Sequence, residues 1–230
     1  MQAGAIIAAA GAGLRMQNNT RKQYLYLAGM PVLARSVKLF LDCNQVGPVV
    51  VVIPPGEEKT VRLLLQPYLV LSDVDFVPGG ETRQQSVANG LKALAGSVDL
   101  VCIHDAARPL ASPDLLERLL ETAAVQGSAV PVIPVSDTVK EIDETGLVMA
   151  TLAREYLRLV QTPQVFRREL LVKAHQVFNA VLAGATDDAA LVETLGRPVQ
   201  TIEGEFTNLK ITTALDLKLA EEILKGAADR

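Results

Sequence analysis

The stretch AAAGAGLRMQNNTRKQY, residues 8–24, places a glycine turn and three basic side chains directly behind an apolar run. Gly11 and Gly13 allow a tight turn in which backbone N–H groups can approach a ligand closely. Arg15 and Lys22 are two of the three cations that follow. Guanidinium and ammonium groups beside exposed backbone donors suit a triphosphate. The alternative interpretation is a solvated basic turn.

Two common nucleotide motifs do not fit this stretch. The dinucleotide fingerprint needs a third glycine where Met16 stands, and a P-loop needs a Gly-Lys-Ser/Thr sequence that does not occur here. An NAD-dependent oxidoreductase also needs an acidic ribose-binding residue about 20 residues beyond the glycines. The first acidic residue after them is Asp42. A non-catalytic nucleotide sensor is a further alternative, because it would bind the nucleotide without releasing pyrophosphate.

The stretch PGGETRQQSVANGL has the pattern of a strand that ends at a glycine pair and leads into a helix. The helix is predicted to begin near Glu81 or Thr82, after Gly80. Arg83 and Ser86 would then project from its first turns toward the same sheet edge as the first loop. This places a corner there that could contact a base or a ribose, unless it is an ordinary turn between strand and helix.

The stretch IHDAARP puts two charged residues at the end of a buried strand. Asp105 can bind a ribose hydroxyl, a metal or a substrate hydroxyl, and Arg108 can bind a phosphate. His104 and His175 are the only histidines, and their surroundings match neither a zinc site nor a catalytic triad. We interpret His104 as a strand-end residue with satisfied hydrogen bonds and His175 as a helix surface residue.

Two further stretches have ordinary structural explanations. TDDAAL, residues 186–191, has the pattern of a helix N-cap with acids in the first turn. NLKIT places Lys210 just before the last helix, where a lone lysine is usually solvated.

The elements that must position these residues alternate between apolar runs and amphipathic stretches. One helix is predicted from Pro31 to Leu41, one from an N-cap at Ser112, and a last one after Thr212 or Thr213. This alternation indicates an α/β, doubly wound, mostly parallel sheet, with ligands at the carboxyl ends of the strands. The expected strands are residues 5–9, 49–53, 75–79, 98–104, 129–135 and 198–204.

Residues 136–164 break the alternation and are typical of a hairpin, so we expect a protruding β-arm at about 136–160. No linker or repeat divides the chain, and we therefore expect a single domain over residues 1–230.

Composition excludes several classes of protein. The hydrophobic fraction of 49% favours a large aliphatic core, and the net charge of −4 argues against a protein that coats nucleic acid. The two cysteines are too few for a disulfide framework. We find neither a targeting segment nor a long uncharged apolar run, and we expect a cytoplasmic protein without a membrane partner.

The order of AAAGAGLRM, KQY, GGETRQQSV, HDAARP, SDTVK, QTPQ, TDDA and NLKIT resembles the 2-C-methyl-D-erythritol 4-phosphate cytidylyltransferase family over nearly the whole chain. The resemblance implies a Rossmann-like nucleotidyltransferase that converts CTP and methylerythritol phosphate to CDP-methylerythritol and pyrophosphate. It also implies Mg²⁺, held mainly by the CTP phosphates rather than by protein ligands. The partners would be CTP, a small sugar-alcohol phosphate and a second subunit of a homodimer, bound through the arm.

The resemblance also assigns site residues. Arg15, Lys22 and Lys210 would be catalytic, by stabilising charge on the phosphates. The nucleotide-binding residues would be Ala9, Ala10, Gly11, Gly13, Gly80, Glu81, Arg83, Ser86 and Asp105. The substrate-binding residues would be Arg108, Thr138, Arg154, Thr162 and Thr186, with Thr138 and Arg154 serving the partner's pocket.

The sequence departs from the family pattern at two positions. An alanine stands where the family usually has a proline after the first strand, and Arg21 replaces the proline before the loop lysine. Neither change removes a charge, so they bear on loop rigidity. The alternative within the same chemistry is a cytidylyltransferase acting on a pentitol phosphate such as ribitol 5-phosphate.

Overall fold

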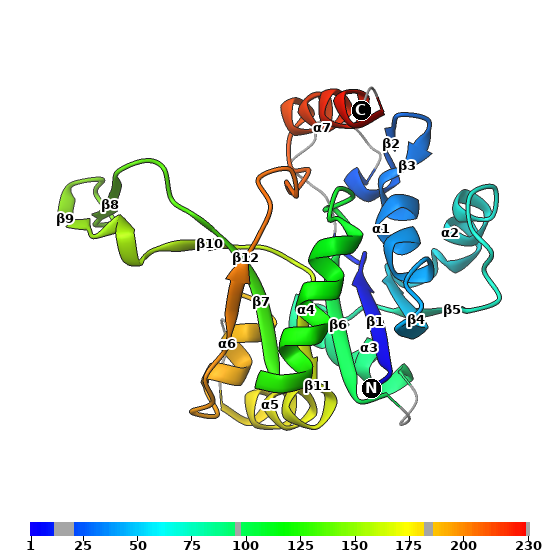
Figure 1. Ribbon diagram of the computed structural model, residues 1–230, viewed down its shortest axis with the longest axis horizontal. Helices are drawn as coiled ribbons and strands as arrows, with labels where there is room; N and C mark the ends of the chain where they lie inside the picture. Colours follow the sequence, from blue (N-terminus) through cyan, green and yellow to red (C-terminus); the bar gives the residue numbers. More distant parts are fainter. Residues whose placement is uncertain (12–20, 95–97, 182–185, 229–230) are drawn as a thin grey trace.

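The computed structural model describes residues 1–11, 21–94, 98–181 and 186–228. Its centre is an eight-stranded sheet with the order β10-β7-β11-β6-β1-β4-β5, and β12 pairs with β7 off this path (Figure 1). The strands are β1 (Ala3–Ala8), β4 (Val46–Ile53), β5 (Val74–Pro78), β6 (Leu100–Asp105), β7 (Ser128–Pro134), β10 (Arg158–Val160), β11 (Gln164–Arg167) and β12 (Thr201–Glu203).

The middle of this sheet is parallel. β1 pairs with β4 on one side and with β6 on the other, and β4 pairs with β5, all in the same direction. β11 runs antiparallel between β6 and β7, while β12 pairs with β7 in parallel. The parallel core brings the carboxyl ends of β1, β5 and β6 to one edge, where the sequence placed its polar residues.

Helices cover both faces of the sheet. α1 (Val32–Leu41), α2 (Glu58–Leu65) and α4 (Pro113–Gln126) pack against one face, and α3 (Arg83–Ala93), α5 (Arg168–Val181) and α6 (Asp188–Glu193) against the other. Alternate residues of β1 show the division, since Ala5 and Ile7 join the first core and Ile6 joins the second. Apolar burial on two sides explains why these strands lack polar alternation. The predicted doubly wound α/β fold is confirmed.

Local sequence signals set several helix starts. The Thr82 hydroxyl accepts a hydrogen bond from the Gln85 backbone, and the Gln85 side chain accepts one from the Thr82 backbone, which is a complete capping box at α3. At α4 the Ser112 hydroxyl accepts the Leu115 N–H as a simple N-cap, and Pro113 occupies the first helical position. α7 (Ala214–Ala228) begins where the Thr213 hydroxyl accepts the Asp216 N–H.

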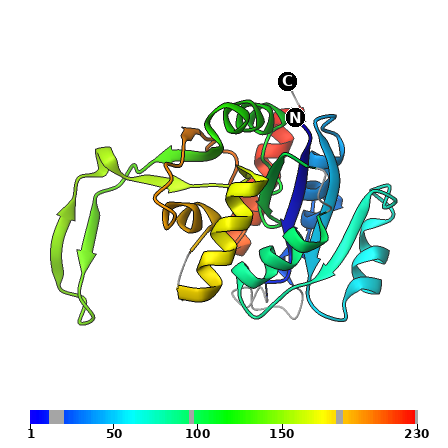
Figure 2. The same cartoon turned by 90° about the horizontal axis from the view of Figure 1, so that it is seen from below.

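A hairpin of β8 (Val139–Ile142) and β9 (Val148–Leu152) extends away from the sheet in both ribbon views (Figure 2). The Asp143 carboxylate accepts backbone N–H groups of Thr145 and Leu147 and so closes its turn. The short helix η2 (Arg154–Tyr156) leads back toward β10.

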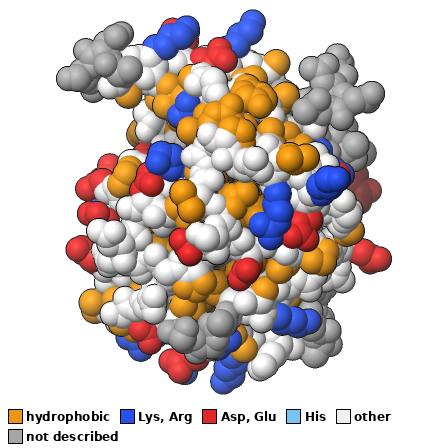
Figure 3. Space-filling view, turned by 90° about the vertical axis from the view of Figure 1, so that its right-hand side faces the viewer, with side chains coloured by type: hydrophobic (Ala, Val, Ile, Leu, Met, Phe, Trp, Pro, Cys, Tyr) orange, Lys and Arg blue, Asp and Glu red, His pale blue; other side chains and the backbone are white. Residues whose placement is uncertain are grey.

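Smaller elements complete the chain. A two-stranded ribbon of β2 (Tyr26–Leu27) and β3 (Met30–Pro31) follows the short helix η1 (Lys22–Tyr24). The face toward the viewer in Figure 3 mixes acidic, basic and apolar side chains, in keeping with the small net charge of −4. None of the described helices is both long and apolar enough to cross a membrane.

Candidate active site

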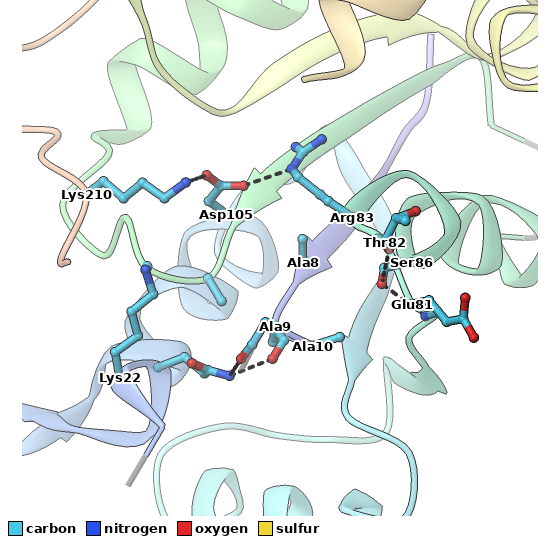
Figure 4. Close-up of a pocket in the computed structure, with 15 residues that line it drawn as sticks. Ala8, Ala9, Ala10, Lys22, Glu81, Thr82, Arg83, Ser86, Asp105 and Lys210 are labelled. Atoms are coloured by element: carbon cyan, nitrogen blue, oxygen red, sulfur yellow. Dashed lines mark hydrogen bonds and ion pairs between the residues drawn. The ribbon is translucent and has the colours of Figure 1, made fainter. Parts of the chain in front are cut away.

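A cavity of roughly 350 Å³ lies at the carboxyl edge of the parallel strands (Figure 4). Its walls come from segments far apart in the sequence: the end of β1, the η1 turn, the start of α3, the end of β6 and the loop before α7. The residues that line it and were predicted as site residues are Ala9, Ala10, Gly11, Lys22, Gly80, Glu81, Arg83, Ser86, Asp105 and Lys210.

The end of β1 is fixed by a side chain from the η1 turn. The Gln23 side-chain amide, which is buried, donates to the Ala9 carbonyl at 2.7 Å and to the Gly11 carbonyl at 3.1 Å. The Ala9 N–H continues the sheet by donating to the Val52 carbonyl. These bonds hold the start of the glycine loop and the turn that carries Lys22 against each other.

The corner between β5 and α3 is tightly packed because of Gly79. A Cβ atom at Gly79 would lie 2.3 Å from the Cβ of Ala10 and 3.0 Å from the Ser86 hydroxyl. The Ser86 hydroxyl accepts the Gly80 N–H at 3.1 Å and donates to the Thr82 carbonyl at 2.9 Å. Gly79 therefore permits the close approach of two loops, and Ser86 sets the shape of the corner.

Four charged side chains form a chain that begins at the cavity wall with Lys210, Asp105 and Arg83 and ends at the buried Asp188 behind it. Lys210 Nζ lies 2.6 Å from Asp105 Oδ2, and Arg83 Nε lies 3.5 Å from Asp105 Oδ1. Arg83 Nη1 lies 2.6 Å from Asp188 Oδ2, whose side chain has no exposed surface. Opposite charges alternate, so each buried carboxylate has a cationic partner.

The charges of this chain set the ionisation of Asp105 and Arg83. Burial alone would raise the pKa of Asp105, but the charges of Arg83, Lys210 and Arg108 outweigh it and hold that pKa far below its usual range. Burial opposes the charge of Arg83, yet Asp188 and Asp105 together raise its pKa. Asp105 is therefore an anion and Arg83 a cation at neutral pH.

Lys22 and Lys210 line the same cavity although they are distant in sequence. Figure 4 shows both side chains at the same end of the cavity, Lys22 from the η1 turn and Lys210 from the loop before α7. The structure thus brings the two predicted lysines together, and it gives Lys210 the partner Asp105 rather than solvent alone.

The wall behind Asp105 is organised by His104, whose side chain has no exposed surface. His104 Nε2 lies 3.0 Å from the Arg108 carbonyl, and Nδ1 lies 3.0 Å from the Thr162 hydroxyl. Because a carbonyl only accepts, Nε2 carries the proton, and the Thr162 hydroxyl donates to Nδ1 while accepting the Asp105 N–H. The prediction that His104 has satisfied hydrogen bonds is confirmed.

Some predicted substrate residues lie outside this cavity. Thr162 is buried behind Asp105, and Arg108 donates to the carbonyls of Asn208 and Val160. Thr138 and Arg154 are exposed near the hairpin, where Arg154 donates to the Ser136 carbonyl.

Three further predicted residues remain to be placed. Thr186 is exposed just before α6. Gly13 and Arg15 lie outside the described residues.

Sequence reasoning missed several residues that support the site, among them Gln23, Asp188 and His175. Asp188 is fully buried and binds Arg83, although TDDAAL indicated only a helix cap, a part that Asp187 plays by accepting the Ala190 N–H. His175 was predicted on a helix surface, and this is wrong. It is 5% exposed, and its Nε2 lies 3.3 Å from Asp188 Oδ1, because α5 packs against α6.

The doubly wound sheet and a cavity that combines glycine-turn backbone, two lysines and an arginine define a nucleotidyltransferase of Rossmann-like fold. A model of the 2-C-methyl-D-erythritol 4-phosphate cytidylyltransferase family matches residues 3–226, and the chain belongs to this family. The family reaction transfers the cytidylyl group of CTP to 2-C-methyl-D-erythritol 4-phosphate, giving CDP-methylerythritol and pyrophosphate. The ribitol 5-phosphate alternative is not favoured.

Individual members of this family are similar to the chain over nearly their full length. The chain is 47% identical over 227 residues to the 2-C-methyl-D-erythritol 4-phosphate cytidylyltransferase of Pelotomaculum thermopropionicum, covering 98% of this chain and 95% of that one. The crystal structure of the Thermus thermophilus cytidylyltransferase has a TM-score of 0.80 at 39% identity, covering 98% and 100% of the two chains. A synthase structure from Anaerococcus prevotii has a TM-score of 0.85 at 31% identity, covering 97% and 96%.

Proposed function

We propose that Lys22 and Lys210 act as a cationic clamp on the CTP phosphates in this reaction, with Arg15 as a third cation. The observation that carries the proposal is the shared cavity, which both lysines line together with Ala9, Ala10 and Gly11. Backbone donors and ammonium groups at one sheet edge are suited to a triphosphate.

The opposite end of the cavity suits the nucleoside. Gly80, Glu81, Arg83 and Ser86 would surround the cytosine. The Asp105 carboxylate, an anion at neutral pH that lies between Arg83 and Lys210, would accept a ribose hydroxyl between the base and the phosphates. Arg108 and Thr186, which lie outside this cavity, would bind the sugar-alcohol phosphate, and the buried Thr162 hydroxyl, which already pairs with His104 and the Asp105 N–H, would support that side of the site.

The chemistry needs no covalent enzyme intermediate. A phosphate oxygen of methylerythritol phosphate attacks the α-phosphorus of CTP, and the bond from that phosphorus to the departing pyrophosphate breaks in line. Negative charge grows on the equatorial oxygens and on the pyrophosphate, so catalysis consists of positioning and charge stabilisation. Lys22 and Lys210 are the described side chains that would supply this stabilisation.

Mg²⁺ fits this site as an ion carried by the nucleotide. Among the described residues, no three His, Cys, Asp or Glu side chains gather closely enough to hold a metal. Glu81 and Asp105 are the two carboxylates among the residues that line the described cavity, and both oxygens of Asp105 already face cations. Bound to the CTP phosphates, the metal would neutralise charge on them.

We further propose that the hairpin joins two copies of the chain into a homodimer, in which Thr138 and Arg154 serve the partner's pocket. Apolar side chains on this segment are strongly exposed, with Met149 at 67% and Tyr156 at 84%. An isolated two-stranded hairpin is at best marginally stable, so a second copy that covers these side chains would stabilise it. Each chain would then be one nucleotidyltransferase domain with its arm, working in the cytoplasm with its cysteines reduced.

The clamp is tested with Lys22→Ala and Lys210→Ala. Loss of one preorganised donor to a charged transition state costs about 10²- to 10³-fold in rate, and we expect this loss in pyrophosphate release while the variants stay folded. Lys225→Ala on the outer part of α7 is the matched control, because Lys225 is 67% exposed and pairs with Glu222 of its own helix. Near-normal turnover of either site variant would remove that lysine from the mechanism.

A further inference from the structure

Glu57, which precedes α2, binds residues on both sides of Lys22 in the η1 turn. Its Oε1 accepts hydrogen bonds from Arg21 Nε at 3.0 Å and Nη2 at 2.9 Å, and its Oε2 accepts one from the Tyr24 hydroxyl at 2.7 Å. Arg21 and Tyr24 flank Lys22 in the chain. Gln23, the remaining neighbour, is bound to the carbonyls of Ala9 and Gly11.

The backbone of the turn depends on the same residues. The Tyr24 N–H donates to the Arg21 carbonyl and the Leu25 N–H to the Lys22 carbonyl, which forms the η1 turn. Arg21 has a φ of −61°, which is the value that a proline ring would impose. Because no ring fixes this angle in arginine, the ion pair with Glu57 is the contact that restrains the residue here. The departure from proline at this position is therefore matched by a tertiary contact.

The ionisation of the cluster agrees with its geometry. Partial burial would raise the pKa of Glu57, but the hydrogen bonds from Tyr24 and Arg21 outweigh it and lower that pKa. Burial and the Glu57 carboxylate both raise the pKa of Tyr24, so the hydroxyl keeps its proton and donates. Glu57 is thus an anion with three donors, which fixes its position more firmly than a single surface contact.

The adjacent glutamate shows the contrast. Glu58 pairs with Arg62 one turn along α2, and both side chains are about half exposed, with 56% and 43% of their surfaces accessible. The Arg21 and Glu57 side chains are each 29% exposed. The first pair stays within its helix, whereas the second joins α2 to the edge of the cavity. Surface pairs such as Glu58 and Arg62 contribute little to stability.

We propose that Glu57 is a positioning residue for nucleotide binding, which acts through Arg21 and Tyr24 to direct the Lys22 ammonium group into the cavity. The inference rests on the proposed role of Lys22 in binding the CTP phosphates. Glu57 itself does not line the cavity. Its contribution should therefore appear in CTP binding and depend on the presence of Lys22.

The test measures steady-state kinetics with CTP and methylerythritol phosphate for Glu57→Gln and for the matched control Glu58→Gln. Glu57→Gln removes the charge but keeps a side chain of the same size, and we expect the KM for CTP to rise about tenfold, as for loss of one charge-assisted hydrogen bond. In Glu57→Gln the KM for methylerythritol phosphate should change less than about twofold. In Glu58→Gln the KM values for CTP and for methylerythritol phosphate should both change less than about twofold. Tyr24→Phe removes one donor and should raise the KM for CTP by a smaller factor.

A double variant separates the two proposals. In Lys22→Ala, the further change Glu57→Gln should have no additional effect on the KM for CTP, because the group it positions is gone. If the KM for CTP of Glu57→Gln equals that of Glu58→Gln, or if Glu57→Gln raises the KM values for CTP and methylerythritol phosphate equally, Glu57 is not a positioning residue for CTP. If Lys22→Ala both binds CTP and releases pyrophosphate normally, the clamp proposal fails at Lys22 whatever Glu57 does.

Discussion

The protonation of His104 gives a prediction that links stability to the geometry behind the active site. Burial of the imidazole lowers the pKa of His104 from about 6.5 to about 4. In the unfolded chain the same side chain binds a proton near its ordinary pKa. Between these values the unfolded state therefore binds more protons than the folded state, and the free energy of unfolding falls as the pH falls.

The magnitude follows from the two pKa values. Linkage with these values lowers the free energy of unfolding by about 2 kcal/mol between pH 7 and pH 5, and the effect levels off below about pH 4. Protonation would also place a second N–H against the Thr162 hydroxyl, which now donates to Nδ1. The centroid of the buried imidazole lies 5.4 Å from the centroid of the Phe40 ring. Water therefore has little access to replace the hydrogen bonds of His104.

The assay is urea unfolding at 25 °C at several pH values between 7 and 5, for the wild type and for His104→Gln. Glutamine can accept from Thr162 and donate to the Arg108 carbonyl without titrating. The variant should have a lower free energy of unfolding than the wild type at pH 7. Between pH 7 and pH 5, however, its free energy of unfolding should fall by about 2 kcal/mol less than that of the wild type. His175→Gln controls for the other histidine. Equal slopes for the wild type and His104→Gln would refute the reasoning.

Two other predictions concern the buried acid and the hairpin. Asp188→Asn removes the charge of the buried carboxylate that lies 2.6 Å from Arg83, while the Asp105 carboxylate stays at 3.5 Å. We expect the variant to have a free energy of unfolding about 3 kcal/mol lower in urea titrations. Asp187→Asn, which keeps a good N-cap, should cost at most about 1 kcal/mol, and equal losses would contradict the charge argument. For the hairpin, Arg154→Ala and Lys22→Ala subunits, each inactive alone, should regain activity when exchanged into heterodimers. Verified heterodimers without activity would show that each pocket is built within one chain.

Most of the positions in the cavity could be predicted from the sequence because they stand at ends of strands. Gly11, Gly80 and Asp105 each follow an apolar run, and in a parallel sheet such ends meet at one edge. Lys22 was indicated by the glycine turn and its neighbouring cations, with a solvated basic turn as the alternative, and the family resemblance supported its assignment. Lys210 was assigned through the resemblance alone, since its position has no local pattern that distinguishes it from a solvated lysine.

The supporting residues could not be predicted because their partners are distant in sequence. Glu57 has the local pattern of an ordinary first turn of a helix, and only folding brings it to Arg21, 36 residues away. Asp188 likewise has the pattern of a capping acid, and its partner Arg83 is 105 residues away. Nor does a short segment such as β11 show its antiparallel pairing between β6 and β7 in its own residues.

The sequence by itself determined the alternation of strands and helices, the sheet edge that carries the polar residues, and the family, because periodicity, turn residues and ordered motifs are local properties of the chain. The tertiary structure decided which charges face each other, which acids are buried and how the Lys22 turn is held. These depend on pairwise distances between remote residues, and burial changes both the strength and the ionisation of each pair.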